Sequence, residues 1–87
     1  MDLREQAPRP GHLTLGEWSW LPRMIDKARA KYTGDIGNYA HPCGRDRILL
    51  SELGISAEEF KEIILATTTD EEVLSGIESL RARKGEA

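Results

Sequence analysis

The sequence predicts an all-α fold, a small orthogonal bundle of about four short helices preceded by an extended N-terminal arm. Apolar residues recur at helical spacing in four stretches, and two of these stretches begin with a capping box. The chain contains a single valine and no alternating run of β-branched residues, which argues against a sheet. With 87 residues, of which 39% are hydrophobic, the chain is long enough for one domain with one modest core.

The two ends of the chain differ in composition from the part between them. Residues 1–17 include two prolines and two glycines without helical periodicity, so they are expected to form an extended or flexible arm. Residues 18–82 are expected to form the helical domain. Residues 83–87 have only charged or small side chains, which predicts a flexible tail.

The first helix is expected to start near Trp20–Pro22, with Ser19 as its N-cap, because proline is tolerated in a first helical turn. One face of this helix is apolar and consists of Leu21, Met24, Ile25, Ala28 and Tyr32. Gly34 is expected to end it, and residues 34–42, with two glycines and one proline, are expected to be irregular.

Three further helices follow along the chain. The second runs from about Gly44 to Leu53, with Gly54 in the left-handed position after it. Its expected inward residues are Ile48, Leu49, Leu50 and Leu53. The third and fourth start at capping boxes whose first residues are Ser56 and Thr69. Their expected apolar stripes are Phe60, Ile63, Ile64 and Thr67, and Val73, Leu74, Ile77 and Leu80.

Charge and composition exclude several functional classes. Residues 1–47 have 8 Lys and Arg against 6 Asp and Glu, a net charge of +2, whereas residues 48–87 have 4 against 9, a net charge of −5. Neither half has the basic patch that binding to nucleic acid requires, so no nucleic-acid partner is predicted. The longest apolar run, Ile63–Ala66, is too short to span a membrane. One cysteine and no secretory signal at the N-terminus favour a cytoplasmic protein without disulfides.

Polar side chains are dense along the first helix and after it. Arginine forks and the start of a helix both favour anions, so a carboxylate or phosphate of a small metabolite is one expected ligand. The candidate ligand-binding residues are Arg23, Asp26, Lys27, Arg29, Tyr39 and Arg47. In the alternative arrangement Arg29 and Asp46 pair across the two helices and the other side chains are solvated.

Three residues are candidates for catalysis, namely His41, Cys43 and Asp46. Cys43 precedes a predicted helix and two arginines, an environment that favours a thiolate, and Asp46 is near enough in sequence to orient His41. The same residues, with His12, offer donors that suit zinc, but their spacing matches no known ligand pattern. We therefore predict no metal and no cofactor, and the sequence leaves open whether the protein is an enzyme.

Trp18 and Trp20 are two residues apart on a segment expected to be extended, which directs their rings to opposite sides. One ring can then cover the core while the other contacts a partner. The first functional hypothesis is a protein-interaction or self-association module that forms a homodimer or binds a larger protein. The second is a binder of, or an enzyme for, a small anionic metabolite.

One decapeptide, Trp20–Arg29, resembles the opening signature of a bacterial family of small proteins known only as a domain of unknown function. Shorter pieces agree with this family in the same order. They are Gly37–Tyr39, Cys43–Arg47, Leu53–Ile55, Phe60 and Asp70–Leu74. The resemblance covers about residues 18–80 and implies a small stand-alone protein. It implies no activity.

Overall fold

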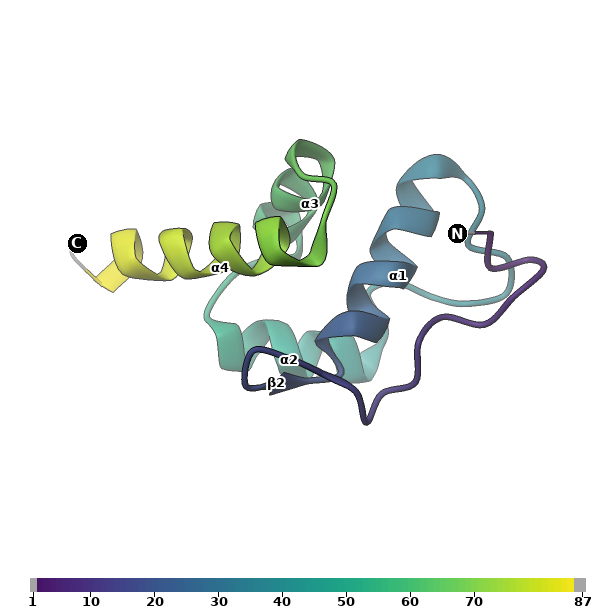
Figure 1. Cartoon of the computed structure of the whole chain (residues 1–87), viewed down its shortest axis with the longest axis horizontal. Helices are drawn as coiled ribbons and strands as arrows, with labels where there is room; N and C mark the ends of the chain where they lie inside the picture. Colours follow the sequence, from purple (N-terminus) through teal and green to yellow (C-terminus); the bar gives the residue numbers. More distant parts are fainter. Residues whose placement is uncertain (1, 86–87) are drawn as a thin grey trace.

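The computed structural model describes residues 2–85, which form four helices and one short hairpin of two strands (Figure 1). In chain order the elements are β1 (Thr14–Leu15), β2 (Trp18–Ser19), α1 (Leu21–Thr33), α2 (Gly44–Leu53), α3 (Ala57–Ala66) and α4 (Asp70–Gly85). The fold is therefore mostly helical, as predicted, but it is not purely α.

The hairpin corrects the expectation of a fold without strands. Its two strands pair antiparallel, with Thr14 opposite Ser19 and Leu15 opposite Trp18. Gly16 lies in the turn between them with a φ of 60°, which a glycine adopts without strain. Two-residue strands are too short to show alternation in a sequence. Leu15 and Trp18 both pack against the helical core, so tertiary contacts stabilise this hairpin.

The start of α1 also differs from the prediction. Its N-cap is Trp20 instead of Ser19, and Trp20 has a left-handed backbone with a φ of 72°. The backbone N–H of Trp20 donates to the Gly11 carbonyl at 2.9 Å, and its indole N–H donates to Asp46 at 2.7 Å. These two contacts fix a conformation that an aromatic residue rarely adopts.

The core consists of buried faces of all four helices. The predicted stripe of α1 is confirmed, with Leu21, Met24, Ile25 and Ala28 fully buried and Tyr32 at the edge. Helix α3 packs against both α1 and α4, and its Phe60 is completely buried.

The inward face predicted for α2 is wrong at one residue. Leu49, Leu50 and Leu53 are buried, but Ile48 is 55% exposed. Successive helical residues point about 100° apart, so three consecutive apolar residues cannot all face one core.

Helix ends largely follow the predicted capping signals. Each capping box has its reciprocal bonds, for example Glu59 N–H to Ser56 Oγ at 3.0 Å and Glu72 N–H to Thr69 Oγ1 at 3.1 Å. Gly34 and Gly54 both adopt the left-handed C-cap conformation. Helix α4 continues to Gly85, so residues 83–85 of the expected tail are helical, and residues 86–87 lie outside the described part of the chain.

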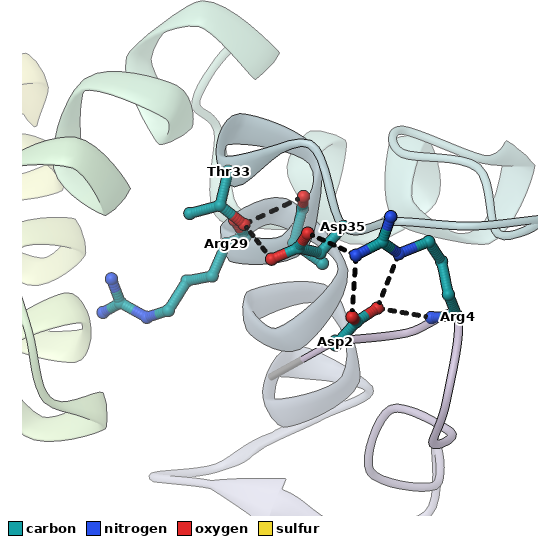
Figure 2. Close-up of polar contacts among 6 residues, drawn as sticks. Asp2, Arg4, Arg29, Thr33 and Asp35 are labelled. Atoms are coloured by element: carbon teal, nitrogen blue, oxygen red, sulfur yellow. Dashed lines mark hydrogen bonds and ion pairs between the residues drawn. The ribbon is translucent and has the colours of Figure 1, made fainter.

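The N-terminal arm lies along the body of the protein. It runs beside α1 in the opposite direction, from the C-terminal end of that helix to its start (Figure 1). Leu3 is buried, and its N–H donates to the Asp35 carbonyl at 2.9 Å. Figure 2 shows the Arg4 guanidinium between Asp2 and Asp35 at this end of α1. The arm is therefore bound to the loop just after α1 through Leu3 and Arg4, and to α1 itself through Arg9, which pairs with Asp26.

Candidate functional site

A buried polar network centred on Asp46 joins α1, α2 and the loop between them. The Asp46 carboxylate accepts hydrogen bonds from the Trp20 indole at 2.7 Å and from the Cys43 backbone N–H at 3.1 Å. Lys27 forms an ion pair with it at 2.8 Å, and His41 Nδ1 lies 3.0 Å from the same oxygen as Lys27. Asp46 and His41 have no exposed side-chain surface, and Lys27 is almost completely buried.

The charge on Asp46 is stabilised by these donors. Burial acts to raise the pKa of this carboxyl group, but the bonds from His41, Lys27, Trp20 and Cys43 outweigh it and bring the pKa well below its ordinary value. Asp46 is therefore ionised at neutral pH and pairs with the buried ammonium of Lys27.

The local sequence explains why these groups meet. Asp46 is at the third position of α2, where a carboxylate accepts from the N-cap backbone, here that of Cys43. Lys27 lies on α1 one turn after Arg23, and His41 lies in the loop that returns the chain to α2. Lys31 also contacts this loop, because its ammonium donates to the His41 carbonyl at 2.6 Å.

Two of the three catalytic candidates, His41 and Asp46, are in direct contact. A carboxylate that accepts from Nδ1 leaves the neutral imidazole with an unprotonated Nε2. His41 Nε2 is buried without a hydrogen-bond partner, and its ring lies 6.0 Å from Phe60 and 6.4 Å from Tyr32, centroid to centroid. Such a dyad is a general base only for a group that reaches this closed interior.

The third candidate, Cys43, contacts Lys27 instead of His41. Its half-buried sulfur lies 3.1 Å from the Lys27 ammonium. In residues 2–85 no group of three or more His, Cys, Asp and Glu side chains is placed to hold a metal ion.

The six candidate ligand-binding residues go to different places. Asp26 binds Arg9, and Lys27 belongs to the Asp46 network. Arg29 donates to the Ile64 and Thr67 carbonyls at the end of α3, at 3.1 and 3.0 Å. Figure 2 shows this side chain pointing away from the Arg4 cluster. Arg47 is exposed on α2. Arg29 and Asp46 therefore do not bind each other.

Arg23 and Tyr39 are brought together, beside Trp20 and Arg45. The Arg23 guanidinium lies 5.3 Å from the Trp20 ring centroid and 5.6 Å from that of Tyr39, and Arg45 lies 5.5 Å from the Trp20 ring. These are cation–π distances. We call the four residues Trp20, Arg23, Tyr39 and Arg45 the Trp20 surface. The other tryptophan, Trp18, packs under Arg81 at 5.1 Å.

The two arginines of the Trp20 surface have little of their charge neutralised. Arg23 makes one hydrogen bond with another described residue, a long one of 3.4 Å to the Arg9 carbonyl, and its Nε is buried without a partner. The nearest carboxylate oxygen to Arg45 belongs to exposed Glu52 and is 3.8 Å away. An ion pair of that length between exposed side chains contributes little. Within the described residues, the surface therefore has two guanidinium groups that no nearby carboxylate neutralises.

Two important arginines were not among the sequence candidates. Arg9 binds Asp26 on α1 at 3.0 Å and Asp70 on α4 at 2.6 Å, and so joins the arm to two helices. Arg45 was noted only as a neighbour of Cys43. A proline on each side of Arg9 was the one sequence signal that this residue has a fixed backbone.

The concave parts of the described surface are open. One pocket has a volume of about 520 Å³ and is lined by Leu3, Arg4, Gly37, Asn38 and Tyr39. Two others of about 250 and 240 Å³ lie against α3. None of these pockets is lined by His41, Cys43 or Asp46. No helix in residues 2–85 is long and apolar enough to cross a membrane.

Together these features define a small, mostly helical domain with a buried lysine–aspartate–histidine network under a cationic, aromatic surface. The family model described as Domain of unknown function (DUF5069) matches residues 5–87, and the chain belongs to this family. The match includes most of the arm as well as the four helices. A search of the curated proteins found no match to the chain.

Proposed function

We propose that the protein is an interaction module that binds an acidic segment of a partner protein at the Trp20 surface. One observation carries this proposal: Arg23 and Arg45 lie 5.3 and 5.5 Å from the centroid of the Trp20 ring, and among the described residues Arg23 has no ion pair and Arg45 has only a long one of 3.8 Å to Glu52. Glutamate or aspartate side chains of a partner would supply the missing charge and the bidentate bonds that guanidinium groups form.

The network beneath this surface supports the proposal because it holds the surface in one arrangement. The Trp20 indole is fixed by its bond to Asp46, and Asp46 also fixes the first turn of α2, which includes Arg45. A preorganised surface loses less conformational entropy when a partner binds. The role of Lys27 and His41 in this proposal is structural, because both are buried beneath the surface.

An extended partner also suits the shape of the site better than an enclosed small molecule. Small ligands bind mainly in cavities that bury most of their surface. The Trp20 surface instead presents two aromatic rings and two guanidinium groups side by side. Tryptophan, tyrosine and arginine side chains contribute much of the binding energy at protein interfaces.

The test is calorimetric titration with a glutamate-rich peptide on the natural protein and on Arg23→Gln and Arg45→Gln. Each substitution removes one positive charge and one guanidinium group. We expect each to weaken binding about 3- to 20-fold, the range for one charged hydrogen bond or one ion pair at the edge of an interface. Arg83→Gln is the matched control, since this exposed arginine near the end of α4 belongs to another pocket. Binding should also weaken with added salt, because the charges are partly exposed.

Two results would overturn the proposal. The first is equal binding by the Arg23, Arg45 and Arg83 variants, which would show that only net charge matters. The second is a dimer in light scattering that dissociates in Arg23→Gln. In that case the acidic half of a second copy, and no separate protein, occupies the surface.

A further inference from the structure

The pocket next to Tyr39 continues directly from the Trp20 surface. One side chain belongs to both, because Tyr39 lies 5.6 Å from the Arg23 guanidinium and also lines the pocket of about 520 Å³. The rest of the lining comes from the arm, through Leu3 and Arg4, and from the loop residues Gly37 and Asn38. A segment bound along Arg23 would therefore reach this pocket without a break.

The pocket and the Trp20 surface differ in how far their arginines are neutralised by carboxylates. Arg4 is the one charged side chain in the pocket lining, and it is already paired with Asp2 at 2.9 Å and with Asp35 at 3.2 Å. Figure 2 shows both carboxylates at its guanidinium. A carboxylate of the partner would gain little binding energy beside Arg4, because this guanidinium is already paired with two carboxylates. The rest of the lining combines the edge of buried Leu3, the Tyr39 ring and the hydrocarbon stem of Arg4 with the amide of Asn38. An apolar side chain with a polar group beside it therefore fits this lining.

We infer that the acidic segment bound at the Trp20 surface also has one large apolar side chain, and that this side chain enters the Tyr39 pocket. This inference rests on the proposed function. The path from Tyr39 through Arg23 and Trp20 to Arg45 has three steps of 5.3–5.6 Å. An extended chain covers about 3.3 Å per residue, so at most about five residues of the partner span this path, the number that a straight path would need. The partner sequence is then a short run of acidic residues with a leucine-like residue at one end.

Asn38 adds a second reason for this placement. It is exposed at the rim of the pocket and makes no side-chain hydrogen bond with another described residue. Its amide both donates and accepts, which suits the backbone of an extended segment as the chain turns into the pocket. The loop thus offers polar contacts for the main chain beside an apolar site for the side chain.

The experiment compares two glutamate-rich peptides that differ at one terminal position, where one has leucine and the other serine. Calorimetry on the natural protein should show the leucine peptide binding about 5- to 10-fold more tightly, as expected for a partly buried leucine. The same pair is then measured on Asn38→Phe, which fills the pocket from its rim. In this variant the preference for leucine should disappear, so that the leucine peptide binds no more tightly than the serine peptide.

A thermal unfolding curve of Asn38→Phe checks that the variant is folded. Asn38→Ala is a second variant, which keeps the pocket open and should keep the preference for the leucine peptide. Equal binding of the two peptides to the natural protein would overturn this inference and leave the proposed function standing. A leucine preference that survives in Asn38→Phe would also overturn it, because the side chain would then bind elsewhere. Failure of both peptides to bind would overturn the proposed function itself.

Discussion

Asp46→Asn is the substitution whose effect follows most directly from the structure. The change is nearly isosteric, but it removes the one carboxylate in residues 2–85 that pairs with the buried Lys27 ammonium. Of the carboxylate oxygens, one accepts from Trp20 and the other faces Lys27, His41 and the Cys43 N–H. An asparagine has one oxygen, so its NH₂ group meets at least one of these donors whichever way the amide is turned.

The magnitude follows from burial. Removing one partner of a buried ion pair costs about 3–5 kcal/mol, because the other charge remains in the interior without compensation. A domain of this length is stable by about 4–13 kcal/mol, so the loss is a large share of the total. In urea, where the slope is about 2 kcal/mol per molar, the midpoint of unfolding should fall by about 2 M. Circular dichroism measures this midpoint.

The matched control is Asp35→Asn, which makes the same chemical change at an exposed ion pair with Arg4. Its cost should stay below about 1 kcal/mol. The pH dependence adds a second check. The pKa of Asp46 is lowered by folding, so its contribution is present above the unfolded value of about 3.9 and is lost as the pH falls through the folded value. The difference between Asp46→Asn and the natural protein should therefore narrow in acid. A cost within 1 kcal/mol of the control would refute this account of the network.

Two further substitutions test how the arm and a helix end are held. Arg9→Gln should destabilise the protein by about 2–3 kcal/mol and speed proteolysis of the arm, because Arg9 binds carboxylates on α1 and α4. The control is Arg4→Gln, which removes an exposed ion pair and should have neither effect. The pKa of Asp70 is lowered chiefly by Arg9, so stability that falls with decreasing pH in the natural protein should fall less in Arg9→Gln. Gly54→Ala should cost about 1 kcal/mol in thermal unfolding, since Gly54 has a φ of 72° and no neighbour that a methyl group would touch. Gly44→Ala, in open space without a positive φ, should be neutral or stabilising.

The helices of this protein could be predicted from the sequence because their signals are local. Capping boxes at Ser56 and Thr69, and the glycines at positions 34 and 54, act within a few residues of the bonds they make. The apolar stripe of α1 is likewise a property of one helix. The hairpin was missed because its strands are two residues long and depend on Leu15 and Trp18 packing against distant helices.

The candidate site was predictable only in part. The sequence predicted that polar residues of the first helix would meet those of the loop and helix after it. The structure joins Arg23 with Tyr39, and Lys27 and His41 with Asp46, whereas Asp26 and Arg29 bind elsewhere. The sequence could not show which of these side chains are buried, because burial depends on how α1 and α2 cross.

The division of the arginines also required the tertiary structure. Arg9, Arg23, Arg29 and Arg45 have the same side chain, and apart from the two prolines that flank Arg9 nothing local distinguishes their partners. Arg9 meets two carboxylates and Arg29 meets the end of α3, but Arg23 and Arg45 meet an indole ring. The sequence by itself determined the helices and their ends, since hydrogen bonds and side-chain periodicity act over a few residues. Only the tertiary structure decided which charges are neutralised and which lie beside an aromatic ring, because an ion pair depends on distance in space and the chain brings together residues up to 61 positions apart.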